Sequence, residues 1–243
     1  MPAPSFRANG TFQSGTTSVT ADVTNTGRQL NDIIVIHIES ANQSLAQAYT
    51  NLTNNGYARP ANSNVVVGTA AAATATMTDI WWKRSDGTEA NVVLGDFGDH
   101  TLVVVSAFSN VITTGDPWDA TVNIAVGTAT SQVNTRNVTT STANALICHF
   151  VSSARDAAAA HLNVNPVLFN SSDEVEVTER YDFGTTSGGG GTAGLITYRK
   201  PTAGAVANLR INTVTSNVAT IFTGALIALP DPSVYPWTQV VIL

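Results

Sequence analysis

The chain alternates between short apolar runs and clusters of turn residues. Nearly every run is five to ten residues long, is rich in Val, Ile, Thr and aromatic residues, and is bounded by Gly, Asn, Asp or Pro. These features are typical of β-strands joined by turns. We therefore predict strands near residues 16–24, 31–39, 64–68, 78–84, 91–95, 101–110, 120–126, 132–140, 144–152, 174–181, 194–200, 206–213 and 219–229.

Helical periodicity is weak along the whole chain. The two helix candidates are the alanine-rich stretches Ala70–Ala75 and Ala157–Ala160, and Ser153 precedes the second as an N-terminal cap. Strands at this density predict an all-β protein, either a β-sandwich or a β-barrel.

The two halves of the chain repeat the same order of segments, which indicates an internal duplication. Because the offsets are nearly equal and the order is kept, chance is a poor explanation. The aligned pairs are 33–38 with 145–150 at an offset of about 112, which places His37 over His149; 79–84 with 195–200 at about 116; and the apolar strands from Leu102 and Ala219, which both end at Asp-Pro, at about 115.

A set of four or five strands with one apolar face cannot bury that face alone, whereas two such sets can pack together. We predict a jelly-roll-like β-sandwich built from two pseudo-repeated Greek-key halves, with little helix. Two separate β-domains are the alternative, although no linker rich in Pro, Gly or Ser interrupts residues 116–132. The expected organisation is an extended N-terminal arm at 1–15, a duplicated sandwich at 16–232 with half-repeats at about 16–119 and 120–232, and a C-terminal arm or docking strand at 233–243.

Charge is scarce in this sequence. Only 12% of its 243 residues are charged, the net charge is −6, and lysine occurs only at Lys83 and Lys200, whereas threonine occurs 34 times. This composition argues against a nucleic-acid partner, because phosphate contacts need clustered Lys and Arg. We also expect no membrane partner, since no apolar stretch reaches about 20 residues, and no disulfide, since Cys148 is the single cysteine.

Each half combines a Thr-rich strand, a step into a hydrophobic strand, an aromatic strand ending in basic residues, and an apolar strand before Asp-Pro. These segments are 16–24, 31–39, 81–84 and 102–111 in the first half, and 139–142, 143–151, 198–200 and 219–230 in the second. The pattern resembles the jelly-roll modules of tailed-bacteriophage virion proteins, of the capsid-decoration and tail-fibre type. The resemblance implies a structural or binding role, and it carries no catalytic residue over to this chain.

The run Gly189–Gly194 formally fits the G-x-G-x-x-G pattern of dinucleotide sites. Such a site needs a strand before it and a helix after it, so that the helix N-terminus faces the pyrophosphate. Here the run leads into the predicted strand 194–200, so we interpret it as a flexible inter-strand loop.

The histidines are candidates for metal or acid-base chemistry. His37 and Glu39 share a strand face, because side chains alternate with a period of two, and they could bridge a metal or relay a proton. The duplication places His149 at the position of His37 and Val151 at that of Glu39, so packing or an inter-strand hydrogen bond is the preferred interpretation. His100 follows the acidic turn with Asp96 and Asp99, where calcium binding is a minority alternative.

Catalytic signatures such as Gly-x-Ser-x-Gly and His-Glu-x-x-His do not occur. A Ser-His-Asp set would need proximity that sequence does not reveal. The acidic segment 173–179 alternates as a strand and is better explained by protection of a sheet edge than by paired glycosidase carboxylates. We therefore expect no enzyme, no catalytic residue, no cofactor and no metal.

Aromatic residues offer a binding alternative. Trp81 and Trp82 point to opposite faces of one strand, so one of them belongs to the core and the other can be exposed. An exposed tryptophan near Tyr57 or Trp118 could stack on a sugar ring, although core or subunit contact is favoured because tryptophan buries a large apolar area.

The C-terminal segment ends in an apolar run, which is unfavourable in water. We expect it to add a strand to its own sheet or, by preference, to dock on a neighbouring protein. The candidate interaction residues are Tyr235, Trp237, Val240, Val241, Ile242 and Leu243.

Together these features predict a structural bacteriophage virion protein. The leading hypothesis is a capsid decoration or cement protein on the capsid surface, which contacts the major capsid protein or other virion proteins and forms a homo-oligomer, with a trimer as the natural guess. A tail-associated receptor- or carbohydrate-binding module is the alternative, and a polysaccharide-degrading enzyme is a weaker third hypothesis.

Overall fold

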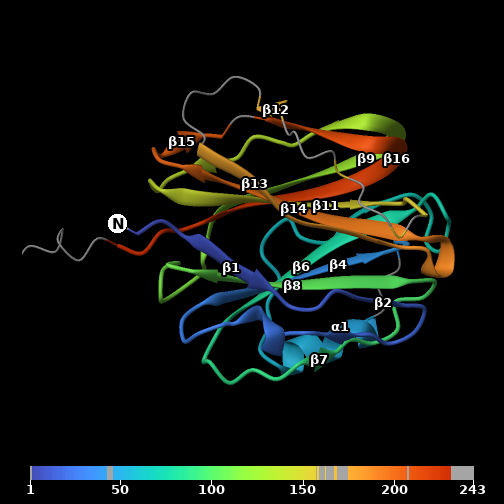
Figure 1. Cartoon of the computed structure of the whole chain (residues 1–243), viewed down its shortest axis with the longest axis horizontal. Helices are drawn as coiled ribbons and strands as arrows, with labels where there is room; N and C mark the ends of the chain where they lie inside the picture. Colours follow the sequence, from blue (N-terminus) through green and yellow to red (C-terminus); the bar gives the residue numbers. More distant parts are fainter. Residues whose placement is uncertain are drawn as a thin grey trace, which may run out of the picture.

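Two strands are buried along their entire length, β4 (Ile33–Ser40) and β11 (Ala145–Ser153). Both are almost continuous apolar runs, and such runs suit strands that are covered on both faces. In the computed structural model each of them forms the centre of an antiparallel sheet, and the two sheets lie face to face (Figure 1). The structure describes residues 2–42, 46–156, 158, 162, 167–168, 175–206 and 208–230, of which 46–48, 167–168 and 175–176 are described by backbone alone.

The first sheet is built from the first half of the chain. Its order is β1-β8-β4-β6-β5, and β2 also pairs with β8. The bounds are β1 Ser5–Asn9, β2 Gln13–Gly15, β5 Val65–Val67, β6 Thr76–Arg84 and β8 Thr101–Ser109.

The second sheet is built from the second half. Its order is β12-β16-β11-β14-β13, and β9 also pairs with β16. The bounds are β9 Trp118–Asn134, β12 Val167–Leu168, β13 Val175–Thr185, β14 Gly191–Lys200 and β16 Leu209–Leu226.

The two sheets share one strand order. Four neighbouring strands of the first sheet have the order β8-β4-β6-β5. The corresponding strands of the second half have the same order in the second sheet, β16-β11-β14-β13. Each half also has a two-stranded ladder: β3 (Thr20–Ala21) with β7 (Val92–Val93), and β10 (Thr139–Thr140) with β15 (Gly204–Ala205). The duplicated all-β sandwich predicted from sequence is therefore confirmed. Each half completes its own sheet, so the chain does not pass back and forth between the sheets.

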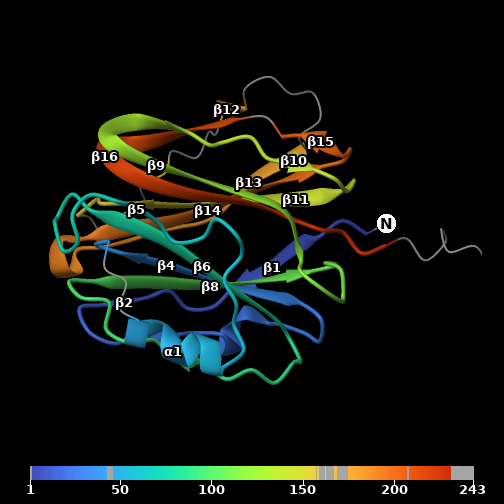
Figure 2. The same cartoon turned by 180° about the vertical axis from the view of Figure 1, so that it is seen from behind.

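The outer faces of both sheets are covered as well. Helix α1 (Ala46–Asn54) and the β3–β7 ladder lie under the first sheet, whereas β10 and β15 lie on the far side of the second (Figures 1 and 2). Leu52, Ala21 and Val92 pack on the first sheet's outer face, and Val138 and Val206 pack on the second's. The central strands are therefore apolar on both sides.

The repeat is aligned one residue differently from the sequence-based offset. Asn31 and Asn144, which are 113 residues apart, both have positive φ (69° and 58°), and each donates its amide to a carbonyl across the sheet, of Ser85 and Pro201 respectively. The ladders agree, because Ile33 pairs with Arg84 and Phe108, whereas Leu146 pairs with Arg199 and Leu226.

This shift reverses the expected equivalence of the two histidines. Side chains alternate along a strand, so a one-residue shift moves a side chain to the other face. His37 points into the space between the sheets, with Ile33 and Val35, whereas His149 shares the outer face of its sheet with Ala145 and Ile147. The predicted placement of His149 over His37 is therefore wrong.

Several predicted boundaries also change. Residues 5–9 and 13–15 pair with β8, so the region 1–15 is an edge of the first sheet rather than an arm. The strand predicted at 120–126 lies within β9, whereas the one predicted at 132–140 contributes only 132–134 to β9 and 139–140 to β10. The separate strands predicted at 206–213 and 219–229 lie largely in β16. In the region 16–24 only Thr20–Ala21 is a strand.

The structure does not place a helix at the first of the two predicted positions. Ala70–Ala75 forms turns, because Ala71 has a positive φ and its amide bonds to Ala41 instead of an intrahelical carbonyl. Most of Ala157–Ala160 lies outside the described residues. Helix α1 was not predicted, although Leu45, Tyr49 and Leu52 follow an i, i+4, i+7 spacing that signals one apolar helix face.

The core between the sheets predicts the cost of losing an aromatic side chain. Phe150 is fully buried, edge-on to the His37 ring (centroids 5.5 Å apart) and beside Phe222. Phe150→Ala should lower the free energy of unfolding by about 3–5 kcal/mol, as measured by urea denaturation, because a cavity forms between the sheets. The control Val214→Ala, at a side chain 58% exposed, should change it by no more than about 0.5 kcal/mol. Equal effects of the two variants would contradict this packing.

Candidate functional site

A chain of polar side chains crosses the interface between the two sheets. His37 Nδ1 lies 2.9 Å from the Tyr181 hydroxyl, and His37 Nε2 lies 2.9 Å from Ser152 Oγ. The Thr78 hydroxyl is 2.8 Å from Ser152 Oγ and 2.9 Å from Thr220 Oγ1. His37 and Thr78 belong to the first sheet, whereas Ser152, Thr220 and Tyr181 belong to the second. We call these five residues the polar seam.

The polar seam contains a serine–histidine pair at the distance used in nucleophilic catalysis. A hydrolytic triad, however, needs a carboxylate on the second imidazole nitrogen, and here that nitrogen contacts the Tyr181 hydroxyl. His37, Ser152, Thr78 and Thr220 are fully buried. Burial lowers the pKa of His37 to about 3, so its imidazole is neutral near pH 7. The geometry therefore suits a structural connection between the sheets rather than attack on a substrate.

His149 forms a second, separate contact. Its Nδ1 lies 2.8 Å from Thr223 Oγ1, and its ring is tilted against that of Tyr198, 5.4 Å between centroids. Burial also lowers the pKa of His149 to about 3. The inter-strand hydrogen bond that we favoured from sequence is present for this histidine.

Glu39 pairs with a different histidine from the one that its strand suggested. Its Oε2 lies 3.0 Å from His100 Nε2, and its Oε1 accepts a hydrogen bond of 2.9 Å from Thr76. All three side chains are buried. The alternative in which Glu39 and His37 share a metal or a proton is not supported, because His37 contacts Ser152 and Tyr181. Residues 39 and 100 are 61 positions apart, and no spacing rule connects them.

The glycine-rich segment covers this pair. It follows β13 as the short 3-10 turn Ser187–Gly189 and continues into β14, as the inter-strand interpretation predicted. The Gly188 carbonyl accepts a hydrogen bond of 3.0 Å from His100 Nδ1. A Cβ at Gly191 would lie 2.1 Å from Glu39 Oε2, so only glycine permits this approach. The segment therefore fastens the second half of the chain to the first.

The contact with Gly188 places a hydrogen on one nitrogen of His100. Because a carbonyl oxygen only accepts, His100 Nδ1 is the donor. Burial raises the pKa of Glu39 against the contacts with His100 and Thr76. Burial alone would lower the pKa of His100, but the hydrogen bond and charge of Glu39 raise it above 6.5.

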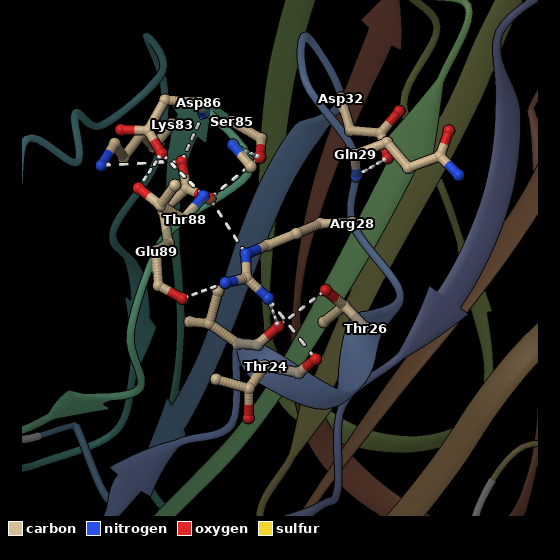
Figure 3. Close-up of polar contacts among 12 residues, drawn as sticks. Thr24, Thr26, Arg28, Gln29, Asp32, Lys83, Ser85, Asp86, Thr88 and Glu89 are labelled. Carbon is tan, nitrogen blue, oxygen red and sulfur yellow. Dashed lines mark hydrogen bonds and ion pairs between the residues drawn. The ribbon is translucent and has the colours of Figure 1, made fainter.

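A charged cluster outside the sheets clamps two loops together (Figure 3). Glu89 accepts hydrogen bonds of 2.9 Å from Arg28 Nε, 2.9 Å from Ser85 Oγ and 2.7 Å from the Asp86 amide. Arg28 also bonds to the carbonyls of Val23 and Glu89. Burial would raise the pKa of Glu89, but these hydrogen bonds hold it below its usual value. The cluster fixes loops 23–28 and 85–89.

The acidic turn before His100 contains a hydrogen bond between two of its own residues. Asp96 accepts a hydrogen bond of 2.7 Å from the Gly98 amide. Within the part of the chain that the structure describes, no three His, Cys, Asp or Glu side chains gather as metal ligands.

The tryptophans divide as expected, with one in the core. Trp81 is buried and donates its indole N–H to Asp79, 3.0 Å away, whereas Trp82 is partly buried against the core between the sheets. Tyr57 and Trp118 are also buried. Neither therefore extends a sugar-stacking platform beside Trp82.

Two predicted segments remain, namely the C-terminal interaction residues and the acidic segment 173–179. The interaction residues Tyr235, Trp237, Val240, Val241, Ile242 and Leu243 lie outside the described residues. The acidic segment enters β13, which is an edge strand of the second sheet. No helix among the described residues is long and apolar enough to cross a membrane.

The histidines of the interior predict sensitivity to mild acid. In the unfolded chain His37 and His149 take up protons near pH 6.5, whereas in the folded state they do so only near pH 3. The free energy of unfolding should therefore fall by about 1.4 kcal/mol per pH unit for each histidine as the pH drops from 6.5 to 5. His149→Gln should reduce this slope by the contribution of one histidine, about 1.4 kcal/mol per pH unit, as measured by urea denaturation at each pH. A flat profile would show that the histidines fold in their charged form.

The Glu39–His100 pair predicts the opposite trend in alkali. The raised pKa of His100 contributes stability that is fully present below pH 6.5. This stability is lost as the pH rises through the pKa that His100 has in the folded chain. Glu39→Gln keeps the shape of the side chain but removes the carboxylate, so the decline in unfolding free energy above pH 6.5 should disappear. Persistence of the same decline in this variant would assign it to other groups.

Comparisons with known proteins add no relative to this geometry. Searches against protein-family models, curated proteins and solved structures find no match for the chain.

Proposed function

We propose that this chain is a non-enzymatic structural protein of a tailed-bacteriophage virion, a capsid decoration or cement protein that binds neighbouring virion proteins. The observation that carries the proposal is the use of its ionisable groups. The serine–histidine and glutamate–histidine pairs, which an enzyme would present to a substrate, are enclosed where they join one half of the chain to the other. The duplicated strand pattern and its resemblance to virion modules supply the class of protein.

The scarcity of charge on the surface supports a role in protein contacts. The chain has 11 basic and 17 acidic residues, 28 in all, and several of them are removed from solvent. The buried ones in the described chain are Asp22, Asp32, Glu39, Asp79, Glu89 and Lys200. At most 22 charged side chains therefore remain for the surface, and interfaces are typically depleted in charge at their centres.

The network of fixed loops supports mechanical stability. Asp22 accepts hydrogen bonds from the Thr11 amide and the Asn25 side chain, and Asp119 accepts them from the amides of Ser141 and Thr142. Hydrogen bonds from these neighbours, against the effect of burial, keep the pKa of both carboxyls low. Such carboxylates hold neighbouring loops in place through hydrogen bonds.

One surface feature favours the second candidate, a tail-associated carbohydrate- or receptor-binding module. A shallow groove of about 500 Å³ on the second half is lined by Val122, Ile124, Asn134, Thr135, Arg136, Asn137 and Asn208. Amide side chains beside aliphatic ones suit an uncharged polar ligand such as a glycan. A glycan array distinguishes the candidates, since binding that is lost on Asn134→Ala favours the tail module.

The capsid proposal predicts the location of the protein and the effect of shortening it. Imaging of the phage particle should place the chain on the capsid, and deletion of residues 237–243 should lower its retention on particles, because this apolar end docks on a neighbour. Circular dichroism of the truncated chain serves as the control for folding. Full retention of a folded, truncated chain would contradict the docking role, and localisation to the tail would replace the proposal with the second candidate.

A further inference from the structure

The shallow groove on the second half of the chain opens between two contacts that join residues 135–138 to residues 206–209. The Thr135 amide donates to the Leu209 carbonyl at 2.9 Å, and the Leu209 amide donates to Thr135 Oγ1 at 2.9 Å. The Val206 amide donates to the Val138 carbonyl at 2.8 Å. These contacts hold the segments between them side by side. The groove-lining residues between the contacts are Arg136, Asn137 and Asn208.

Arg136 has a guanidinium group without a partner. Its side chain is exposed, and within the described part of the chain it forms no hydrogen bond, ion pair or ring contact. Arg7, Arg28 and Arg59 pair with carboxylates, Arg84 bonds to backbone carbonyls, and the remaining arginines also have interactions. None of the residues that line the groove is acidic. The groove therefore contains one positive charge without a counter-charge.

Three asparagines line the same groove, and an amide side chain both donates and accepts hydrogen bonds. Asn134 and Asn137 are exposed, and their side chains have no hydrogen bond within the described chain. Asn208 Oδ1 is enclosed and accepts no hydrogen bond, which is unfavourable for a polar atom. Because the amide can turn about its Cβ–Cγ bond, a donor in the groove can satisfy this oxygen.

The groove also has an aliphatic wall. Val122 and Ile124 lie on one face of β9, because side chains alternate along a strand. Both are partly buried against the apolar clusters beneath them. Sugar rings combine C–H groups with hydroxyls, so they match a site that combines aliphatic surface with amide side chains.

The two unsatisfied groups together restrict the class of ligand. A phosphate or sulfate ion would neutralise Arg136, but these anions offer only acceptors and leave Asn208 Oδ1 without a donor. A neutral sugar supplies hydroxyl donors but leaves Arg136 without a counter-charge. A sugar with a carboxylate satisfies both requirements, and carboxylates pair with planar guanidinium groups through two hydrogen bonds.

We propose that this groove binds an acidic sugar, with the sugar carboxylate at Arg136 and the sugar hydroxyls at Asn134, Asn137 and Asn208. The inference goes beyond the capsid proposal, which concerns contacts between proteins, and it does not depend on where the chain lies in the particle. It replaces the uncharged glycan that the amide and aliphatic side chains alone would suggest, because Arg136 adds a charge.

A glycan array tests the class of ligand. The purified chain should bind glycans that end in uronic or sialic acid, and it should bind their neutral counterparts at least about tenfold more weakly, because a charged hydrogen bond is lost. Isothermal titration calorimetry should give the same ratio for trigalacturonic acid and its methyl ester, which has uncharged carboxyl groups. Failure of every acidic glycan to bind, or equal affinity for the acid and the ester, would overturn the inference.

Variants test the residues that are named. Arg136→Gln should weaken the binding of trigalacturonic acid by about tenfold or more and leave the affinity for the methyl ester unchanged, a split that misfolding would not produce. Asn208→Ala should weaken the binding of both sugars, because a contact with a hydroxyl is lost. The matched control Gln132→Ala, at an exposed residue of β9 that does not line the groove, should leave both affinities unchanged. Unaltered binding of the acid to Arg136→Gln would contradict the proposal.

Hexaglutamate distinguishes a sugar from an acidic peptide. It should bind at least about tenfold more weakly than trigalacturonic acid, because its side chains have no hydroxyl donors for the asparagines. Equal or tighter binding would overturn the inference and assign the groove to an acidic peptide. These outcomes concern the groove alone, so they leave the capsid proposal standing, whereas absence of the chain from the capsid would defeat that proposal and leave the groove's ligand unchanged.

Discussion

Contact between the inner faces of the two sheets is the constraint on which the rest of this structure depends. Each half of the chain forms a sheet whose central strand is apolar on both sides, so neither sheet is stable in water until both of its faces are covered. The inner faces cover each other, and α1 with the small ladders covers the outer ones. Within this interface the polar seam connects His37 and Thr78 of one sheet to Ser152, Thr220 and Tyr181 of the other. Because every hydrogen bond of such a seam has a defined partner, it fixes how the sheets sit relative to each other, whereas apolar contact alone is less selective.

The same interface explains why His37, a candidate for catalysis in the sequence, pairs with hydroxyl groups in the structure. An imidazole placed between two sheets loses its water, so its neutral form is favoured and hydroxyl groups of the opposite sheet become its partners. The Glu39–His100 pair follows a related logic, since burial removes water from both groups and they contact each other instead. The Gly188 carbonyl and the close approach of Gly191 then tie this pair to the second half of the chain. Polar chemistry in the interior thus joins the two repeats.

The charge of the molecular surface bears on the proposed function. Carboxylates such as Asp22, Glu89 and Asp119 are used to hold loops, which leaves a surface with few charges and many threonine and asparagine side chains. The scarcity of surface charge supports the capsid proposal, because interfaces are depleted in charged residues at their centres.

The sequence by itself determined the all-β class, the internal duplication and most strands, because strand punctuation and apolar runs are local properties. Strand alternation indicated that one of Trp81 and Trp82 belongs to the core, and the structure shows that this residue is Trp81. The tertiary structure decided the alignment of the repeats, since a one-residue offset is invisible in a run of uniformly apolar residues yet reverses which face His37 and His149 occupy. It also decided the partners of Glu39, Arg28 and Ser152, which lie tens of residues away in the chain and are brought close only by sheet pairing and sheet packing. Spacing rules describe neighbours within one strand or helix, whereas these contacts arise from the placement of whole sheets.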